Sequence, residues 1–201
     1  MQVDKVVVRS ILTTLAAIVA LIATAVLILV FLFPSTMMNV TYDLGMDSAS
    51  VYFAKSAYRQ NGDVSYIAFA TETCIGADND GGTVECAELL MKDDKFFSYA
   101  QSKDEKLNVS YGSYKKFVCT NYALACYDVN DKEKAITFVK SVSGTAYAAD
   151  EPLVALFVYA IGKEDGETVR SLHGAVSALS ASGENAVRLQ NLLTLAAPYL
   201  H

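Results

Sequence analysis

The chain has 201 residues, 53% of them hydrophobic, and a formal net charge of −6 at pH 7. Nucleic acids and anionic lipid head groups attract basic patches, so this acidity argues against both and we expect no nucleic-acid partner. The four cysteines include no C-x-x-C pair and only two histidines accompany them, so the ligand spacing of a zinc site is absent and we expect neither a metal nor a cofactor.

Residues 10–33 form an apolar stretch that starts at Ser10, ends at Phe33 and contains no charged residue. As a helix it is about 36 Å long, enough to cross a hydrocarbon core of about 30 Å. A cleaved signal peptide is the alternative, but its apolar region usually runs about 7–15 residues and ends in small residues. The stretch therefore predicts an uncleaved signal anchor and a single-pass membrane protein.

The basic residues around this stretch indicate its orientation. Lys5 and Arg9 precede the span, whereas the first basic residue after it is Lys55. Because Lys and Arg concentrate on the cytoplasmic side, residues 1–9 are expected to be a short cytoplasmic tail. The large C-terminal part is then expected outside the cytoplasm, at the plasma membrane.

Residues 34–44 are expected to be a juxtamembrane linker. Pro34 ends the apolar helix, because proline has no N–H to donate. Met37, Met38 and Tyr42 are suited to the membrane–water interface, where tyrosine presents an apolar ring and a polar tip.

From residue 45 onward the hydrophobic spacing is that of helices, and no strand-like alternation is convincing. The expected fold is all-α, with a helical domain over 45–201. The polar residues 101–108 are expected to be a loop. The expected helices cover about 45–61, 63–75, 83–92, 96–100, 110–127, 132–147, 152–161, 166–180 and 184–195.

A short pattern recurs along this domain. Ala54, Tyr58 and Asn61 reappear 69 positions later as Ala123, Tyr127 and Asn130. Weaker copies place Met91 and Tyr159 at positions equivalent to Tyr58 and Tyr127, at steps of 33, 36 and 32 residues.

Helical hairpins of about 34 residues with Ala-x-x-x-Tyr before a tight turn resemble tetratricopeptide repeats. The resemblance covers about residues 45–180, without the family's Trp, its first-helix Leu-Gly or its closing Pro. It implies an array of antiparallel hairpins that stack because one hairpin cannot bury its apolar face alone. An irregular helical bundle is the alternative.

Cys74 and Cys86 flank a glycine-rich turn at residues 76–82, so a disulfide between them is geometrically possible. The alternative is that all four cysteines are small buried thiols. The acidic turn that contains Asp78 and Asp80 is similar to a calcium loop, but Gly82 stands where a ligand is needed, which favours an ordinary helix connection.

No arrangement of nucleophile and base is evident. His173 is a single histidine on a predicted helix, and the motifs of phosphate, dinucleotide and zinc-protease sites are absent. We therefore expect a membrane-anchored helical scaffold or adaptor that binds a protein or peptide, and not an enzyme. The twelve tyrosines either line a binding groove or fill the core.

Two other functions stay open. One is a cell-envelope enzyme whose site is assembled from dispersed carboxylates and tyrosines. The other is a structural subunit whose span packs against other membrane proteins. Small residues that would permit such packing are Ala16, Ala17, Ala20 and Ala23.

Overall fold

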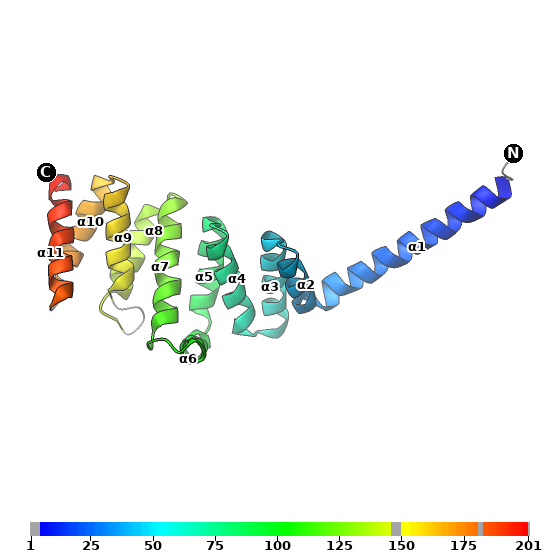
Figure 1. The fold of residues 1–201 in the computed structure, drawn as a ribbon, viewed down its shortest axis with the longest axis horizontal. Helices are drawn as coiled ribbons and strands as arrows, with labels where there is room; N and C mark the ends of the chain where they lie inside the picture. The colour runs from blue at the N-terminus through cyan, green and yellow to red at the C-terminus, as the bar shows by residue number, and fades with distance from the viewer. Residues whose placement is uncertain (1–4, 146–149, 181–182, 201) are drawn as a thin grey trace. The chain divides into compact units, whose positions relative to one another are not determined.

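The structure is a computed structural model that describes residues 5–145, 150–180 and 183–200. In these residues the chain forms eleven α-helices, one short 3-10 helix and no strand, so the predicted all-α fold is confirmed (Figure 1). The chain divides into two compact units, Met1–Tyr66 and Ile67–His201.

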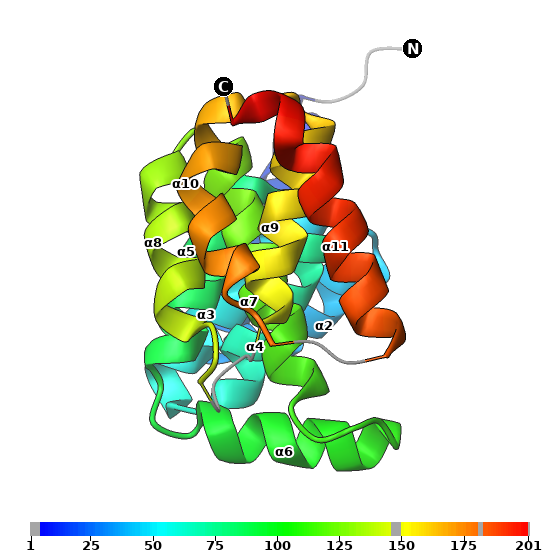
Figure 2. The same ribbon diagram turned by 90° about the vertical axis from the view of Figure 1, so that its left-hand side faces the viewer.

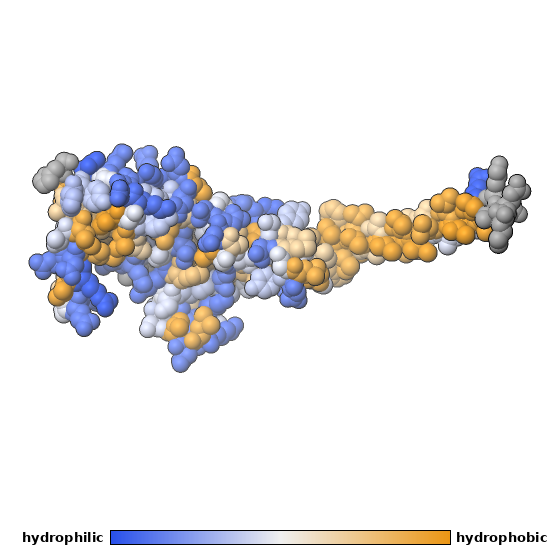
Figure 3. Space-filling view, turned by 45° about the horizontal axis from the view of Figure 1, so that its top comes forward, coloured by the Kyte–Doolittle hydropathy of each residue, from blue (hydrophilic) through white to orange (hydrophobic). Residues whose placement is uncertain are grey.

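The N-terminal unit begins with α1 (Lys5–Leu32), a helix that is apolar on all sides. Residues Val7–Leu32 form a helix that is long and apolar enough to cross a membrane, and none of these residues is buried. Figure 3 shows this apolar surface along the length of the helix. The predicted span is thus a single continuous helix, which begins five residues earlier than expected.

Residues 34–44 are mostly helix rather than an irregular linker. Pro34 is the first residue of α2 (Pro34–Asp43), where its missing N–H costs nothing because the first turn has no intrahelical acceptor. α2 packs against α3 (Asp47–Asn61). Met38 is buried in this contact rather than presented to an interface, whereas Tyr42 is exposed.

The boundary between the two units falls within α4 (Val64–Gly76), and the C-terminal unit contains this helix from Ile67 onward. α7 packs against α5, α8 and α9, and α9 packs against α10. α6 lies crosswise at one end of these helices (Figure 2). The remaining elements are α5 (Asp80–Lys92), α6 (Phe96–Leu107), α7 (Ser113–Asp128), α8 (Lys132–Val142), α9 (Glu151–Gly162), α10 (Gly166–Ser177), α11 (Glu184–Ala196) and a 3-10 turn (Ala197–Tyr199).

Two segments differ from the sequence-based prediction. Residues 101–108 belong mostly to α6, because Ala100 and Asp104 continue the buried face that begins at Phe96. α8 ends at Val142, before the predicted end at residue 147, and residues 146–149 lie outside the described part of the chain.

One turn recurs between successive helices. A residue with positive φ lies two positions after the end of the first helix. The next residue, Asn or Asp, accepts a backbone N–H at the start of the second helix. The N–H of that Asn or Asp also donates to the carbonyl five residues earlier, at 2.9–3.0 Å. This satisfies helix-end groups that would otherwise lack partners. The pairs are Asp78–Asn79, Asn130–Asp131 and Glu164–Asp165.

The four repeat-equivalent positions lie alike in their helices. Tyr58, Met91, Tyr127 and Tyr159 each fall in the last turn of α3, α5, α7 and α9. Tyr127 is buried, whereas the other three are half-buried. The four positions therefore share a place near a helix end but not one register, since Tyr127 lies three residues before Asn130 and Tyr159 lies five before Glu164. Membership of a repeat family stays a prediction.

Tyrosines tie the helices of the C-terminal unit together. In four places a tyrosine hydroxyl donates to a carboxylate on another helix or turn, at 2.7–3.0 Å. A lysine Nζ lies 5.0–5.9 Å from the centroid of each of these rings. The tyrosine, carboxylate and lysine of each tie are Tyr114, Glu72 and Lys103; Tyr122, Glu88 and Lys134; Tyr127, Asp165 and Lys132; and Tyr159, Asp128 and Lys163.

Asp165 accepts the most hydrogen bonds among these carboxylates. Its Oδ2 accepts from the Tyr127 hydroxyl at 2.8 Å, from Lys132 Nζ at 2.7 Å and from the Thr168 hydroxyl at 2.8 Å. Burial alone would raise the pKa of Asp165, but hydrogen bonds from Lys132, Thr168 and Tyr127 outweigh it and hold that pKa well below its usual value of 3.8. Asp165 therefore stabilises the fold only while it is ionised.

The substitution Asp165→Asn should lower the free energy of unfolding at pH 7 by about 2–3 kcal/mol, because charge-assisted bonds are lost. Since the folded pKa is depressed, this contribution is present above about pH 4 and is lost as the pH falls below it. The wild type should therefore lose more stability on acidification than Asp165→Asn. Urea unfolding followed by circular dichroism from pH 7 to pH 2 measures this, and Glu164→Gln at the exposed neighbour is the control.

Candidate functional site

A group of exposed apolar side chains lies on α6, on the loop that follows it and on the first part of α7. Of the exposed large apolar side chains described in residues 67–201, half fall between positions 97 and 117. We call this group the α6 surface, and its members are Phe97, Leu107, Val109, Tyr111 and Phe117.

The sequence of α6 separates a buried face from this exposed one. Phe96, Ala100 and Asp104 recur every four residues and are all buried, so Phe97 is turned outward and is 46% exposed. Asp93 lies in the turn before the helix, where its Oδ1 accepts the Lys95 N–H at 2.8 Å.

Asp104 holds the connection between α6 and α7. Its side chain is 2% exposed, and its two carboxylate oxygens accept the N–H of Gly112 at 2.7 Å and the N–H of Tyr114 at 2.8 Å. Gly112 has φ +84°, a conformation that residues with a Cβ rarely adopt. The loop that carries Tyr111 is therefore fixed by two charge-assisted bonds to a buried carboxylate.

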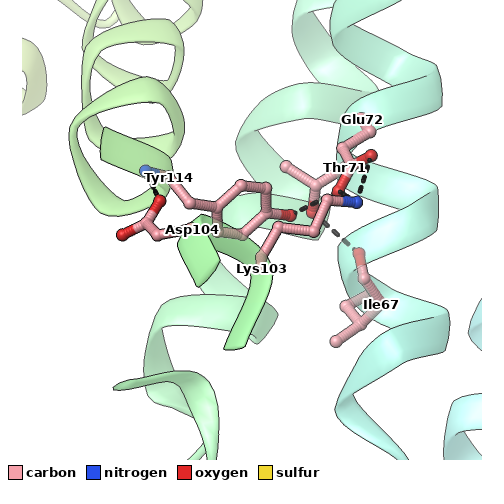
Figure 4. Close-up of polar contacts among 6 residues, drawn as sticks. All are labelled: Ile67, Thr71, Glu72, Lys103, Asp104 and Tyr114. Atoms are coloured by element: carbon pink, nitrogen blue, oxygen red, sulfur yellow. Dashed lines mark hydrogen bonds and ion pairs between the residues drawn. The ribbon is translucent and has the colours of Figure 1, made fainter. Parts of the chain in front are cut away.

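Glu72 on α4 joins α6 and α7 from the other side. Figure 4 shows Lys103 and Tyr114 converging on its carboxylate, with Lys103 Nζ at 2.9 Å and the Tyr114 hydroxyl at 2.7 Å. Burial and the charge of Glu72 raise the pKa of Tyr114, so the hydroxyl stays protonated and donates. Burial opposes the charge of Lys103, but its hydrogen bond with Glu72 outweighs this and raises the Lys103 pKa.

Lys115 lies between two of the exposed rings. Its Nζ is 4.7 Å from the ring centroid of Phe97 and 5.2 Å from that of Tyr111, and the residue is only 4% exposed. A cation attracts the faces of both rings, which holds them in place while they remain exposed. Phe97 and Tyr111 are 46% and 71% exposed in this arrangement.

These contacts place the exposed side chains of the α6 surface on a base of buried polar bonds. Its members are aromatic and aliphatic side chains on a base of buried hydrogen bonds, so little conformational freedom would be lost when a partner covers them. One charged residue beside it, Lys103, already pairs with Glu72 at 2.9 Å.

A second feature is a cleft of about 160 Å³ between α5, α7 and α9, lined by three carboxylates and a tyrosine. Tyr159 donates to Asp128 at 2.8 Å. Burial raises the pKa of Asp80, and the nearby charges of Asp128 and Asp78 raise it further. Among the described residues, no group of three or more His, Cys, Asp or Glu side chains is placed to hold a metal ion.

A third feature is a groove of about 620 Å³ between α9 and α11. Val154, Leu189 and Leu192 contribute apolar surface to it. Glu151 at its edge already pairs with Lys116 at 3.2 Å. None of the described residues that line the groove is aromatic, which makes it a poorer candidate than the α6 surface.

In the part of the chain that the structure describes, the cysteines and His173 form no cluster that could hold a metal ion. Cys74 and Cys86 are buried, and the disulfide that their spacing permits is not formed in this structure. Burial raises the pKa of Cys119 to about 12 although Lys115 opposes this shift, so its thiol stays protonated at neutral pH. His173 is half-buried on α10, and His201 lies outside the described residues.

The sequence-based reading missed the α6 surface. It assigned residues 101–108, most of which belong to α6, to a loop, and it considered how many tyrosines the chain has rather than where they lie. The available signal was local: Phe97, Tyr111 and Phe117 fall within 21 residues, although their exposure depends on which face of α6 is buried.

Comparison of the chain with protein-family models, with curated proteins and with solved structures finds no match. The function is therefore argued from the geometry of the chain itself.

The substitution Asp104→Asn should destabilise the C-terminal unit by about 2–3 kcal/mol, because an amide NH₂ would face a backbone N–H that now donates to a carboxylate. Thermal unfolding followed by circular dichroism measures the change, and Glu105→Gln at the exposed next position is the matched control. Equal melting temperatures for both variants would contradict the role given to Asp104.

Proposed function

We propose that the protein is a single-pass membrane scaffold that binds a protein or peptide partner through the α6 surface. The observation that carries this proposal is the exposure of Phe97, Tyr111 and Phe117 on a base fixed by Asp104 and Glu72. α1 supplies the anchor, by its length and its apolar composition.

The composition of the α6 surface favours a protein or peptide as the partner. Aromatic residues are enriched at protein interfaces and dominate their binding free energy. The lysine between Phe97 and Tyr111 keeps both rings in one orientation. A partner with apolar side chains that cover these rings would bury surface that is now in water.

The topology belongs to the same proposal. Lys5 and Arg9 before the span favour a cytoplasmic N-terminus, which leaves the helical domain outside the cytoplasm at the plasma membrane. The recurring turn and the equivalent positions of Tyr58 and Tyr127 support a hairpin array like that of tetratricopeptide repeats.

An enzyme remains the second candidate because of one observation. Asp80 has a raised pKa in a cleft that also contains Asp78, Asp128 and Tyr159. A carboxylic acid of raised pKa next to a second carboxylate is the pairing that general acid–base chemistry uses. The cleft is small and Asp128 is already held by Tyr159, so binding through the α6 surface is the better-supported function.

Protease added to intact cells should digest the helical domain and leave a small membrane-embedded fragment, because the proposed orientation exposes that domain. Immunoblotting with tags at each end of the chain measures the outcome. Protection of the domain until the cells are permeabilised would reverse the proposed orientation.

A photo-crosslinking amino acid at Tyr111, which is 71% exposed, should form an adduct with a partner in native membranes. The double change Phe97→Ser and Phe117→Ser should lower the yield of this adduct about tenfold or more, since the loss of aromatic anchors lowers the binding free energy by about 1–4 kcal/mol. The same crosslinker at Val187, 59% exposed on α11, is the control. An adduct that survives the double change would show that the α6 surface is not the binding site.

A further inference from the structure

The chain changes direction sharply where α1 ends. Phe33 has φ −130° and ψ 57°, outside the helical range, and Pro34 then starts α2. In Figure 1, α2 runs across the end of α1 rather than continuing along it. Backbone bonds from Phe33 to Leu29 and from Met37 to Phe33, of 3.0 and 3.1 Å, join the two helices through this bend.

A second contact fixes the bend. Gln60, near the end of α3, donates from Nε2 to the carbonyl of Phe31 at 3.1 Å. This bond satisfies a carbonyl in the last turn of α1, where an intrahelical partner is lacking. Because α2 and α3 also pack on each other, the hairpin and α1 belong to one compact unit.

The hairpin leaves a series of large side chains uncovered next to the end of α1. Residues 34–46 contain a single charged residue, Asp43, and no basic one. Figure 3 shows apolar surface beyond the end of α1 as well as along it. The exposed side chains, with their exposed fractions, are Phe33 at 50%, Val40 at 45%, Tyr42 at 50%, Leu44 at 69% and Met46 at 52%.

A membrane environment accounts for this exposure. Spanning helices lie on average within about 20° of the bilayer normal, so a helix that crosses the end of α1 runs along the membrane surface. At that depth apolar side chains leave water, tyrosine places its ring among the lipids and its hydroxyl in water, and a helix keeps its backbone groups paired. α2 is a helix of this kind, continuous with the apolar surface of α1.

We propose that α2 and the turn to α3 lie in the interfacial layer of the bilayer that α1 crosses, with Val40, Leu44 and Met46 immersed in it. This inference rests on the proposed membrane anchor. The segment has no basic residue, so its binding requires no anionic lipid, and zwitterionic phosphatidylcholine suffices.

The chain contains no tryptophan, so one introduced tryptophan reports on a single position. The full chain, carrying Leu21→Trp, Val40→Trp or Leu44→Trp, is reconstituted in phosphatidylcholine vesicles. Part of the lipid carries bromine, either near the head-group end or near the methyl end of its acyl chains. Val129→Trp is the matched control, because Val129 is 42% exposed against 45% for Val40 and lies in the C-terminal unit.

For Val40→Trp and Leu44→Trp we expect blue-shifted emission and a loss of intensity that is larger with shallow than with deep bromines. For Leu21→Trp the deep bromines should quench the emission more than the shallow ones do. For Val129→Trp we expect the emission of a tryptophan in water, with no quenching by shallow or deep bromines. Unquenched tryptophans at 40 and 44 beside a quenched one at 21 would overturn the interfacial placement alone. An unquenched tryptophan at position 21 would overturn the membrane anchor and this inference with it. Equal quenching at positions 129 and 40 would indicate that the whole protein adsorbs to the vesicles, which would also overturn the interfacial placement.

Discussion

The need to pair backbone groups at helix ends constrains this fold more than any other single requirement. Three of the described helix connections meet it with two residues, a left-handed one followed by Asn or Asp: Asp78–Asn79, Asn130–Asp131 and Glu164–Asp165. The second residue pairs its N–H with the end of one helix and its side chain with the start of the next. Because the same turn recurs, the chain reverses in the same way between α4 and α5, between α7 and α8, and between α9 and α10.

The cross-helix ties depend on these reversals. Asp165 is both the cap of α10 and the acceptor for Tyr127 and Lys132, so one carboxylate ends a turn and joins two hairpins. Tyrosine suits this role, since its ring packs among apolar side chains and its hydroxyl reaches a carboxylate at the edge of the core. Tyr114, Tyr122 and Tyr127 are buried in these ties and therefore serve packing, whereas Tyr159 also lines the cleft between α5, α7 and α9.

The elements that the sequence predicted well are those whose signal is carried by one stretch alone. The residues of α1 are apolar on every side of the helix, which is typical of a membrane span. In Asn61-Gly62 the glycine indicates the left-handed conformation that ends α3. α6 could not be predicted in full, because Asp104 looks like a loop residue until the amides of Gly112 and Tyr114 are placed beside it. α2 was missed for a related reason, since Met38 is buried only against a helix that follows it.

The candidate site was less predictable than the fold. Whether Phe97 lies inside or outside depends on which face of α6 meets α7, and the sequence of α6 offers an aromatic residue to both faces. The spacing of Cys74 and Cys86 fits a disulfide and equally fits two buried thiols. In the structure both residues are buried and no disulfide joins them.

The recurring turn also shows where the molecule is less stable than its architecture allows. At the turn between α9 and α10 the left-handed position holds Glu164, with φ +57°. Asn and Asp adopt this conformation readily, as at the equivalent Asp78 and Asn130, but glutamate has no short side chain to support it. Strain of about 1 kcal/mol or more is therefore stored in one exposed residue, and a glycine there would release it at some cost in unfolded-chain entropy. Directed evolution for thermostability would thus be expected to find position 164 early.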